Sequence, residues 1–201
     1  MIEILLADDE TLIRDALAGL LGLEEDLHVV ATAASGAAAV AAARTYRPDV
    51  AVLDLQMPDG DGVAAATQIH DEVPTCRTMI VTSHGRPGYL KRALAAGVSG
   101  FLPKTVSARA LAEAVRQVHD GGRYVDPELA ADAISAGESP LTPREADVLE
   151  LAATGAPAEE IAQRAHLSPG TVRNYLSAAV TKLGAANRHE AVQVARRHGW
   201  I

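Results

Sequence analysis

The first 120 residues alternate short apolar runs with amphipathic stretches, and this alternation restricts the fold more than any other feature. The runs are too short for helices and are rich in Val, Ile or Leu, as β-strands are. They are Ile2–Ala7, Leu27–Thr32, Val50–Leu53, Arg77–Val81 and Val98–Leu102. Between them, apolar residues recur at helical spacing, as Ile13, Leu17 and Leu20 do. Five repeats of strand and helix predict an α/β fold with a five-stranded parallel sheet covered by helices on both faces.

The remainder of the chain has a different pattern. Periodicity fades after Gly121-Gly122, so residues 121–140 are expected to be a linker, with one short helix around Glu128–Ile134. A purely helical region then begins at Leu141-Thr142-Pro143. Thr142 is a predicted N-cap, and Glu145 stands at the position that completes a capping box. Four helices fit the rest of the chain: 143–153, 158–165, 169–183 and 187–198. The predicted domains are therefore 1–120 and 141–201.

Charge is distributed unevenly between these domains. The chain has a net charge of −8, but residues 1–140 carry −9 and residues 141–201 carry +1. The helical region is therefore compatible with nucleic-acid binding without being basic. No apolar run reaches the roughly 18 residues of a membrane span, and the N-terminus does not read as a signal peptide. Together with the single cysteine, Cys76, this predicts a cytoplasmic protein.

Polar residues follow four of the five predicted strands. Asp8 and Asp9 follow the first strand, Asp54 the third, Thr82 the fourth and Lys104 the fifth. Because the carboxyl ends of parallel strands meet at one edge of a sheet, these side chains are expected to converge. Crowded carboxylates repel one another unless a hard cation such as Mg²⁺ joins them. Asp54 could then act as a nucleophile that forms an acyl phosphate.

Each of these residues alone has a simpler interpretation. An aspartate after a strand is commonly a helix N-cap, Thr82 alone would be a turn residue, and Lys104 alone a surface charge. The complete set favours chemistry, because Lys104 supplies a charge and Thr82 a hydrogen bond for phosphate oxygens.

The predicted first domain, residues 1–120, strongly resembles the receiver domain of two-component response regulators. The matching motifs are Ala7-Asp8-Asp9, Asp54-Leu55-Gln56-Met57-Pro58-Asp59-Gly60, Val81-Thr82-Ser83 and Gly100-Phe101-Leu102-Pro103-Lys104. The resemblance implies a flavodoxin-like fold and phosphorylation of Asp54 by a sensor histidine kinase. It implies that Asp9, Asp54 and the Gln56 backbone carbonyl hold Mg²⁺, with indirect help from Asp8. Thr82 and Phe101 match the family's switch pair, although core packing of the only phenylalanine is the simpler reading of Phe101.

The helical region contains a predicted helix-turn-helix. Helix 158–165 is followed by His166-Leu167-Ser168 and then by a longer helix that Ser168 caps. One face of the longer helix carries Arg173, Asn174, Ser177 and Thr181. Arginine can pair with guanine and asparagine with adenine in the major groove, and Thr171 could hold a phosphate. The alternative is a generic four-helix module whose polar face is only solvated.

Motifs in this region look like a LuxR-type DNA-binding domain. They include Leu141-Thr142-Pro143-Arg144-Glu145, Glu160-Ile161-Ala162, Thr171-Val172-Arg173-Asn174-Tyr175 and Lys182-Leu183-Gly184. Together with the receiver motifs, these motifs make the chain resemble the NarL/FixJ family. The segment Arg86-Pro87-Gly88-Tyr89 is similar to the corresponding segment of that family's DesR-like branch. The resemblance implies a transcriptional regulator, not an enzyme, that binds paired half-sites of double-stranded DNA as a homodimer formed on phosphorylation. The expected DNA-binding residues are Ser168, Thr171, Arg173, Asn174, Tyr175, Ser177, Thr181 and Lys182.

Two departures from the family pattern are visible. Thr105 follows Lys104 where many receivers have a cis proline, so the local backbone geometry is open. Pro157, Ala158 and Glu159 stand where the first helix of the motif usually has Ser or Thr and a Lys, so one cap and one phosphate contact are expected to be lost. Modest affinity of one protomer is therefore expected, which favours dimeric binding.

Three other functions remain open from the sequence. A regulator that binds DNA regardless of phosphate is disfavoured by the intact pocket. An aspartate-nucleophile phosphatase would usually carry Asp-x-Asp, whereas Gln56 stands two residues after Asp54. If the protein were a protein-interaction adaptor, mutation of Arg173 and Asn174 would leave DNA binding unaffected.

Overall fold

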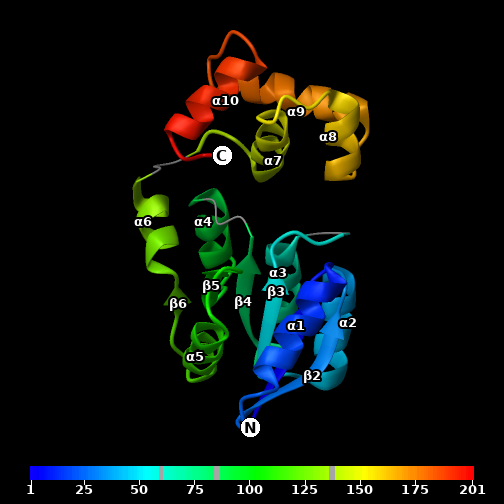
Figure 1. Ribbon diagram of the computed structural model, residues 1–201, viewed down its shortest axis with the longest axis vertical. Coiled ribbons are helices and arrows are strands. Elements are labelled where there is room, and N and C mark those ends of the chain that lie inside the picture. Colours follow the sequence, from blue (N-terminus) through cyan, green and yellow to red (C-terminus); the bar gives the residue numbers. More distant parts are fainter. Residues whose placement is uncertain (59–60, 84–86, 136–138) are drawn as a thin grey trace. The chain divides into compact units, whose positions relative to one another are not determined.

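The computed structural model describes residues 1–58, 61–83, 87–135 and 139–201 (Figure 1). The chain forms two compact units, a sheet with its helices and a group of C-terminal helices, and the main boundary along the chain lies between Leu129 and Ala130. Residues 59, 60 and 86 of the motifs above lie outside the described residues.

The first unit is built on a parallel sheet in the order β2-β1-β3-β4-β5-β6. Its strands are β1 (Ile2–Ala7), β2 (Leu27–Ala33), β3 (Val50–Asp54), β4 (Arg77–Thr82), β5 (Gly100–Pro103) and β6 (Tyr124–Val125). The connecting helices are α1 (Thr11–Leu21), α2 (Gly36–Tyr46), α3 (Gly62–Glu72), α4 (Pro87–Ala95) and α5 (Ala108–His119). The predicted α/β architecture is confirmed.

The sheet has six strands, one more than predicted. The extra strand β6 lies within the segment expected to be a linker and pairs with β5 through Gly100 and Phe101. Gly121 adopts a φ of 93°, a left-handed conformation that glycine tolerates, and this turns the chain back along β5. Two residues are too few to show alternation in the sequence, which explains why the strand was not predicted. The short helix expected next is present as α6 (Pro127–Ser135).

Helices on both faces keep the sheet buried. Helices α1 and α5 pack together over the alternating residues Ile4 and Leu6 of β1, while α2 and α3 pack together on the other face. Ser35 and Ser107 accept the backbone N–H groups of Ala38 and Ala110 and so cap α2 and α5. This arrangement brings the ends of β1, β3, β4 and β5 to one edge.

The second unit contains α7 (Pro143–Ala152), α8 (Ala158–Ala165), α9 (Pro169–Lys182) and α10 (Arg188–Arg197). The predicted capping box is present, because Thr142 and Glu145 each accept the other's backbone N–H. His166 has a φ of 53° and ends α8, so the chain turns sharply into α9. Val172, Leu176 and Ala179 form the buried stripe of α9. After α10, the rings of His198 and Trp200 stack with centroids 4.5 Å apart.

Candidate functional site

The ends of adjacent strands hold the predicted pocket residues in register. Ala7, which precedes Asp8, pairs with Leu53, and Asp54 pairs with Val81. Thr82 pairs with Pro103, and its carbonyl oxygen accepts the backbone N–H of Lys104 at 2.7 Å. The peptide bonds of the described residues, including the one between Lys104 and Thr105, are trans. Hydrogen bonding within the sheet therefore determines the positions from which the functional side chains extend.

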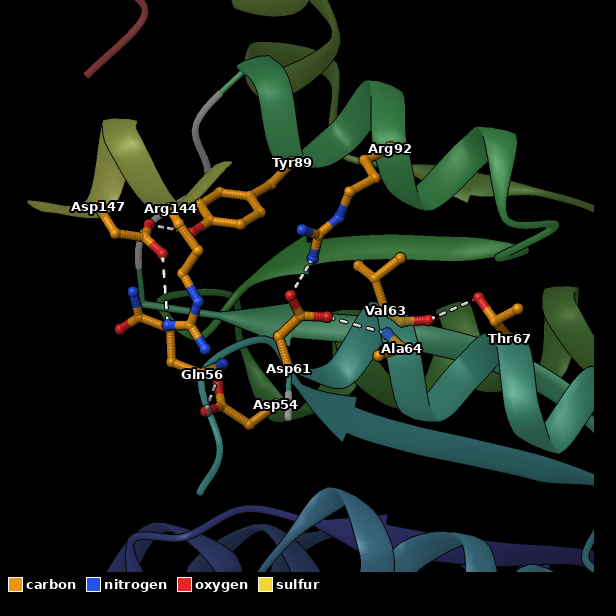
Figure 2. Close-up of polar contacts among 10 residues, drawn as sticks. All are labelled: Asp54, Gln56, Asp61, Val63, Ala64, Thr67, Tyr89, Arg92, Arg144 and Asp147. Atoms are coloured by element: carbon orange, nitrogen blue, oxygen red, sulfur yellow. Dashed lines mark hydrogen bonds and ion pairs between the residues drawn. The ribbon is translucent and has the colours of Figure 1, made fainter. Parts of the chain in front are cut away.

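Three carboxylates meet at this edge. Asp8, Asp9 and Asp54 each offer an oxygen atom, and these three atoms lie within 4.8 Å of one another. Asp8 and Asp54 are buried, whereas Asp9 is exposed. The backbone N–H of Gln56 donates to Asp54 Oδ2 at 3.1 Å, as Figure 2 shows. The position of Asp54 is thus defined by its strand and by the loop that follows.

Lys104 is the cation of the pocket. Its Nζ lies 2.7 Å from Asp8 Oδ2 and 3.1 Å from Asp54 Oδ1, and its side chain is only 11% exposed. Burial alone would lower the pKa of Lys104, but its bond to Asp8 and the charge of Asp54 outweigh this effect and raise the pKa. Lys104 therefore stays protonated and bridges two carboxylates.

One ammonium group does not balance three carboxylates. Burial raises the pKa of Asp54 to about 6; the charge of Asp8 adds to this effect and Lys104 opposes it. At neutral pH Asp54 is therefore mainly ionised, as a nucleophile must be, but at a cost in free energy. A hard divalent cation with a preference for oxygen ligands would offset that charge, so the donor set fits Mg²⁺.

Gly62 brings α3 against the strand end that carries Asp54. A Cβ atom at Gly62 would lie 2.1 Å from the Asp54 carbonyl oxygen, which is far inside van der Waals contact. The Gly62 N–H also donates to the carbonyl of Leu55 at 2.9 Å. The sequence analysis did not identify Gly62, because a close approach between backbone segments leaves no sequence signal beyond the glycine itself.

A second contact fixes the start of α3. Asp61 accepts the backbone N–H of Ala64 at 2.9 Å and so caps the helix, and its other oxygen pairs with Arg92 of α4 (Figure 2). The start of α3 is thus fixed by the glycine contact and by this ion pair, which the sequence analysis also missed. Ion pairs between residues 31 positions apart cannot be predicted from spacing.

The predicted switch residues are both buried. Thr82 is 2% exposed and Phe101 is fully buried. They lie on neighbouring strands, since Phe101 pairs with Ile80, two residues before Thr82. Phe101 also belongs to the strand that β6 extends. The structure therefore places both residues in the core, one of them at the end of β4.

The predicted DNA-binding residues occur on or beside α9. Ser168 accepts the backbone N–H of Thr171 at 3.1 Å and caps the helix. The side chains of Arg173, Asn174, Ser177 and Thr181 are all exposed, and Thr171 and Tyr175 are half-buried. Helix α9 therefore presents a polar face to solvent opposite its buried stripe.

Lys182, also predicted to bind DNA, has a partner inside the protein. Its Nζ lies 2.7 Å from Glu145 Oε2, and the Glu145 side chain is only 7% exposed. Burial alone would raise the pKa of Glu145, but the bonds from Lys182 and Thr142 prevail and lower the pKa. This ion pair joins the end of α9 to the start of α7, a structural role that the sequence analysis did not identify.

Together, the acidic pocket at the sheet edge and the helix-turn-helix are typical of a receiver-type α/β domain joined to a helix-turn-helix domain. The model of the response regulator receiver domain matches residues 4–116, and that of bacterial regulatory proteins of the luxR family matches residues 139–195. The chain belongs to the response regulators with a LuxR-type domain, as its motifs predicted. It is a transcriptional regulator and not an enzyme.

Similar proteins span the same two domains. The transcriptional regulatory protein DesR of Bacillus subtilis (strain 168) is 42% identical over 201 residues, which is all of both chains. The uncharacterized transcriptional regulatory protein YvfU of the same strain is 39% identical over the same extent. The crystal structure of the response regulator ChrA, from a heme-sensing two-component system, is 30% identical with a TM-score of 0.58 and covers 100% of this chain and 98% of its own.

Proposed function

We propose that phosphorylation of Asp54 by a sensor histidine kinase controls the DNA binding of this regulator. The proposal rests above all on one observation: the buried Asp54 lies 3.1 Å from Lys104 and shares its pocket with two further carboxylates. We assign residues 1–120, extended by the edge strand β6, to the receiver, the rest of 121–140 to the linker and 141–201 to the DNA-binding domain. Among the described residues, no helix has the length and apolar character needed to cross a membrane, and we place the protein in the cytoplasm.

The pocket residues have complementary roles in the transfer. An Asp54 oxygen attacks the phosphorus of a phosphohistidine, the N–P bond breaks, and its electron pair stays on the imidazole nitrogen. The product is an acyl phosphate on Asp54. Asp9, Asp54 and the Gln56 backbone carbonyl, with indirect help from Asp8, would hold Mg²⁺, which would offset the charge of the carboxylates and of the incoming oxygens. Lys104 then exchanges its Asp54 partner for a phosphoryl oxygen.

The buried pair Thr82 and Phe101 transmits the effect of phosphorylation from the pocket to the rest of the receiver. The Thr82 hydroxyl moves to donate a hydrogen bond to the phosphoryl group, and the Phe101 ring, already buried in this structure, repacks behind it. This is a shift between two states that differ in how well they dimerise. The dimer places two copies of α9 on paired half-sites.

On each half-site, Arg173 and Asn174 contact base edges in the major groove. The remaining residues hold phosphates or support the helix: Ser168, Thr171, Tyr175, Ser177, Thr181 and Lys182. The exposure of Arg173, Asn174, Ser177 and Thr181 on one face of α9, together with the DNA-binding family of the domain, supports this assignment.

The deciding experiment compares DNA binding and mass before and after treatment with acetyl phosphate and Mg²⁺. The DNA is a duplex selected from a random-sequence pool by the phosphorylated protein. Wild type and the control Asp71→Asn, at an exposed position of α3, should gain one phosphoryl group, dimerise and bind more tightly. Asp54→Asn should do none of these. If Asp54→Asn dimerised and bound as well as phosphorylated wild type, control by phosphate would be wrong.

A further inference from the structure

Helix α9 carries two cations, Arg173 and Lys182, and no carboxylate of its own. Each cation nevertheless has an acidic partner on another helix. Lys182 pairs with Glu145 of α7, and Arg173 Nη1 lies 3.5 Å from Glu159 Oε1 of α8. The positive charge that DNA would meet on this helix is therefore opposed from within the domain.

The two pairs differ in what they can do. Glu145 is buried and also accepts the backbone N–H of Thr142 at 2.7 Å, so that pair is part of the domain's packing. Arg173 and Glu159 are both mostly exposed, with side chains 63% and 67% accessible. An exposed pair of this kind contributes little to stability and opens readily. It can therefore be exchanged for contacts with another anion.

We infer that Glu159 is an affinity-limiting residue of the DNA-binding surface, because its carboxylate competes with DNA for the Arg173 guanidinium. The inference rests on the proposed contact between Arg173 and DNA. In the free protein Arg173 pairs with Glu159, and on binding it must leave that partner. The free energy needed to open the pair weakens binding of one protomer to any duplex.

The size of the effect follows from the strength of exposed ion pairs. Opening such a pair lowers the affinity of one protomer about 1.5- to 5-fold. Two protomers on paired half-sites multiply the factor, which gives a reduction on the order of 2- to 25-fold. Glu159 thus keeps one protomer below the affinity at which it occupies DNA alone, so that occupancy depends on dimerisation.

Glu160 provides a matched control for the test. Both glutamates stand in the first turn of α8, which has no side-chain cap, and both are exposed. Glu160 lies 3.9 Å from Arg164 of its own helix. Replacing either residue by Gln removes the same charge from the same helix end, but only Glu159→Gln releases Arg173.

The experiment measures, by fluorescence anisotropy, the binding of the full chain to a selected duplex and a mixed-sequence duplex at about 0.15 M salt. We expect Glu159→Gln to bind both more tightly than Glu160→Gln does. In an Arg173→Ala background the two substitutions should have equal effects. Equal effects of the two substitutions in the presence of Arg173 would overturn the inference about Glu159. An advantage of Glu159→Gln that persists in the Arg173→Ala background would also overturn it. Neither result would contradict the proposed contact between Arg173 and DNA. If Arg173→Ala left binding to both duplexes unchanged, the proposed DNA contact itself would be wrong.

Discussion

Asp54→Asn is expected to stabilise the receiver in the absence of divalent cations, although it removes the phosphoacceptor. Burial raises the pKa of Asp54 from 3.8 to about 6, so at neutral pH the folded state holds a carboxylate that the unfolded state ionises more easily. One pKa unit corresponds to about 1.4 kcal/mol, and the shift therefore opposes folding by about 3 kcal/mol. Asparagine cannot ionise but gives up the contact with Lys104, so we expect a net gain of about 1–3 kcal/mol.

The sign of the pH dependence tests this reasoning. Because the pKa of Asp54 is higher in the folded state, its unfavourable contribution is absent below about pH 4 and grows until the pH exceeds about 6. The gain from Asp54→Asn should therefore be small at pH 4 and full at pH 7.5. Urea unfolding followed by circular dichroism in EDTA measures the gain, and Asp71→Asn should change stability by less than about 0.5 kcal/mol.

Magnesium should reverse the order of stability, so that wild type becomes more stable than Asp54→Asn. Millimolar Mg²⁺ stabilises the wild type by mass action if it binds only the folded pocket, and it should stabilise Asp54→Asn less, because one carboxylate ligand is gone. An Asp54→Asn protein that is no more stable than wild type at pH 7.5 in EDTA would refute the reasoning.

The outcomes of three further substitutions follow from the immediate surroundings of each residue. Gly62→Ala should destabilise the receiver by about 1–3 kcal/mol and slow phosphorylation by acetyl phosphate, since its Cβ would meet the Asp54 carbonyl at 2.1 Å. Gly19→Ala, in α1 with open space around it, should instead stabilise by about 0.5–1 kcal/mol in the same urea titration. Lys182→Met should destabilise the C-terminal unit by about 1–3 kcal/mol, because the Glu145 carboxylate loses its partner; an unchanged thermal midpoint would contradict this.

The main features of both units could be predicted from the sequence because they depend on short-range patterns. Strand-length apolar runs predict the sheet, and the topology of a parallel sheet then brings Asp8, Asp54 and Lys104 together although they are far apart in the chain. The capping box at Thr142 was equally predictable, since it depends on a spacing of three residues.

The features that escaped prediction depend on pairs without a fixed spacing. Glu159 and Arg173 stand 14 positions apart and Glu145 and Lys182 stand 37 apart, and many other charges could have paired instead. The close approach at Gly62 likewise depends on how tightly α3 packs on β3, which no local pattern encodes.

The stacked rings at the C-terminus give the two units different optical properties. Trp200 is the only tryptophan of the chain and lies against His198, so tryptophan emission originates entirely in the DNA-binding unit. The receiver, which has no tryptophan, is silent at these wavelengths. Tryptophan emission thus reports unfolding of the DNA-binding unit without interference from the receiver.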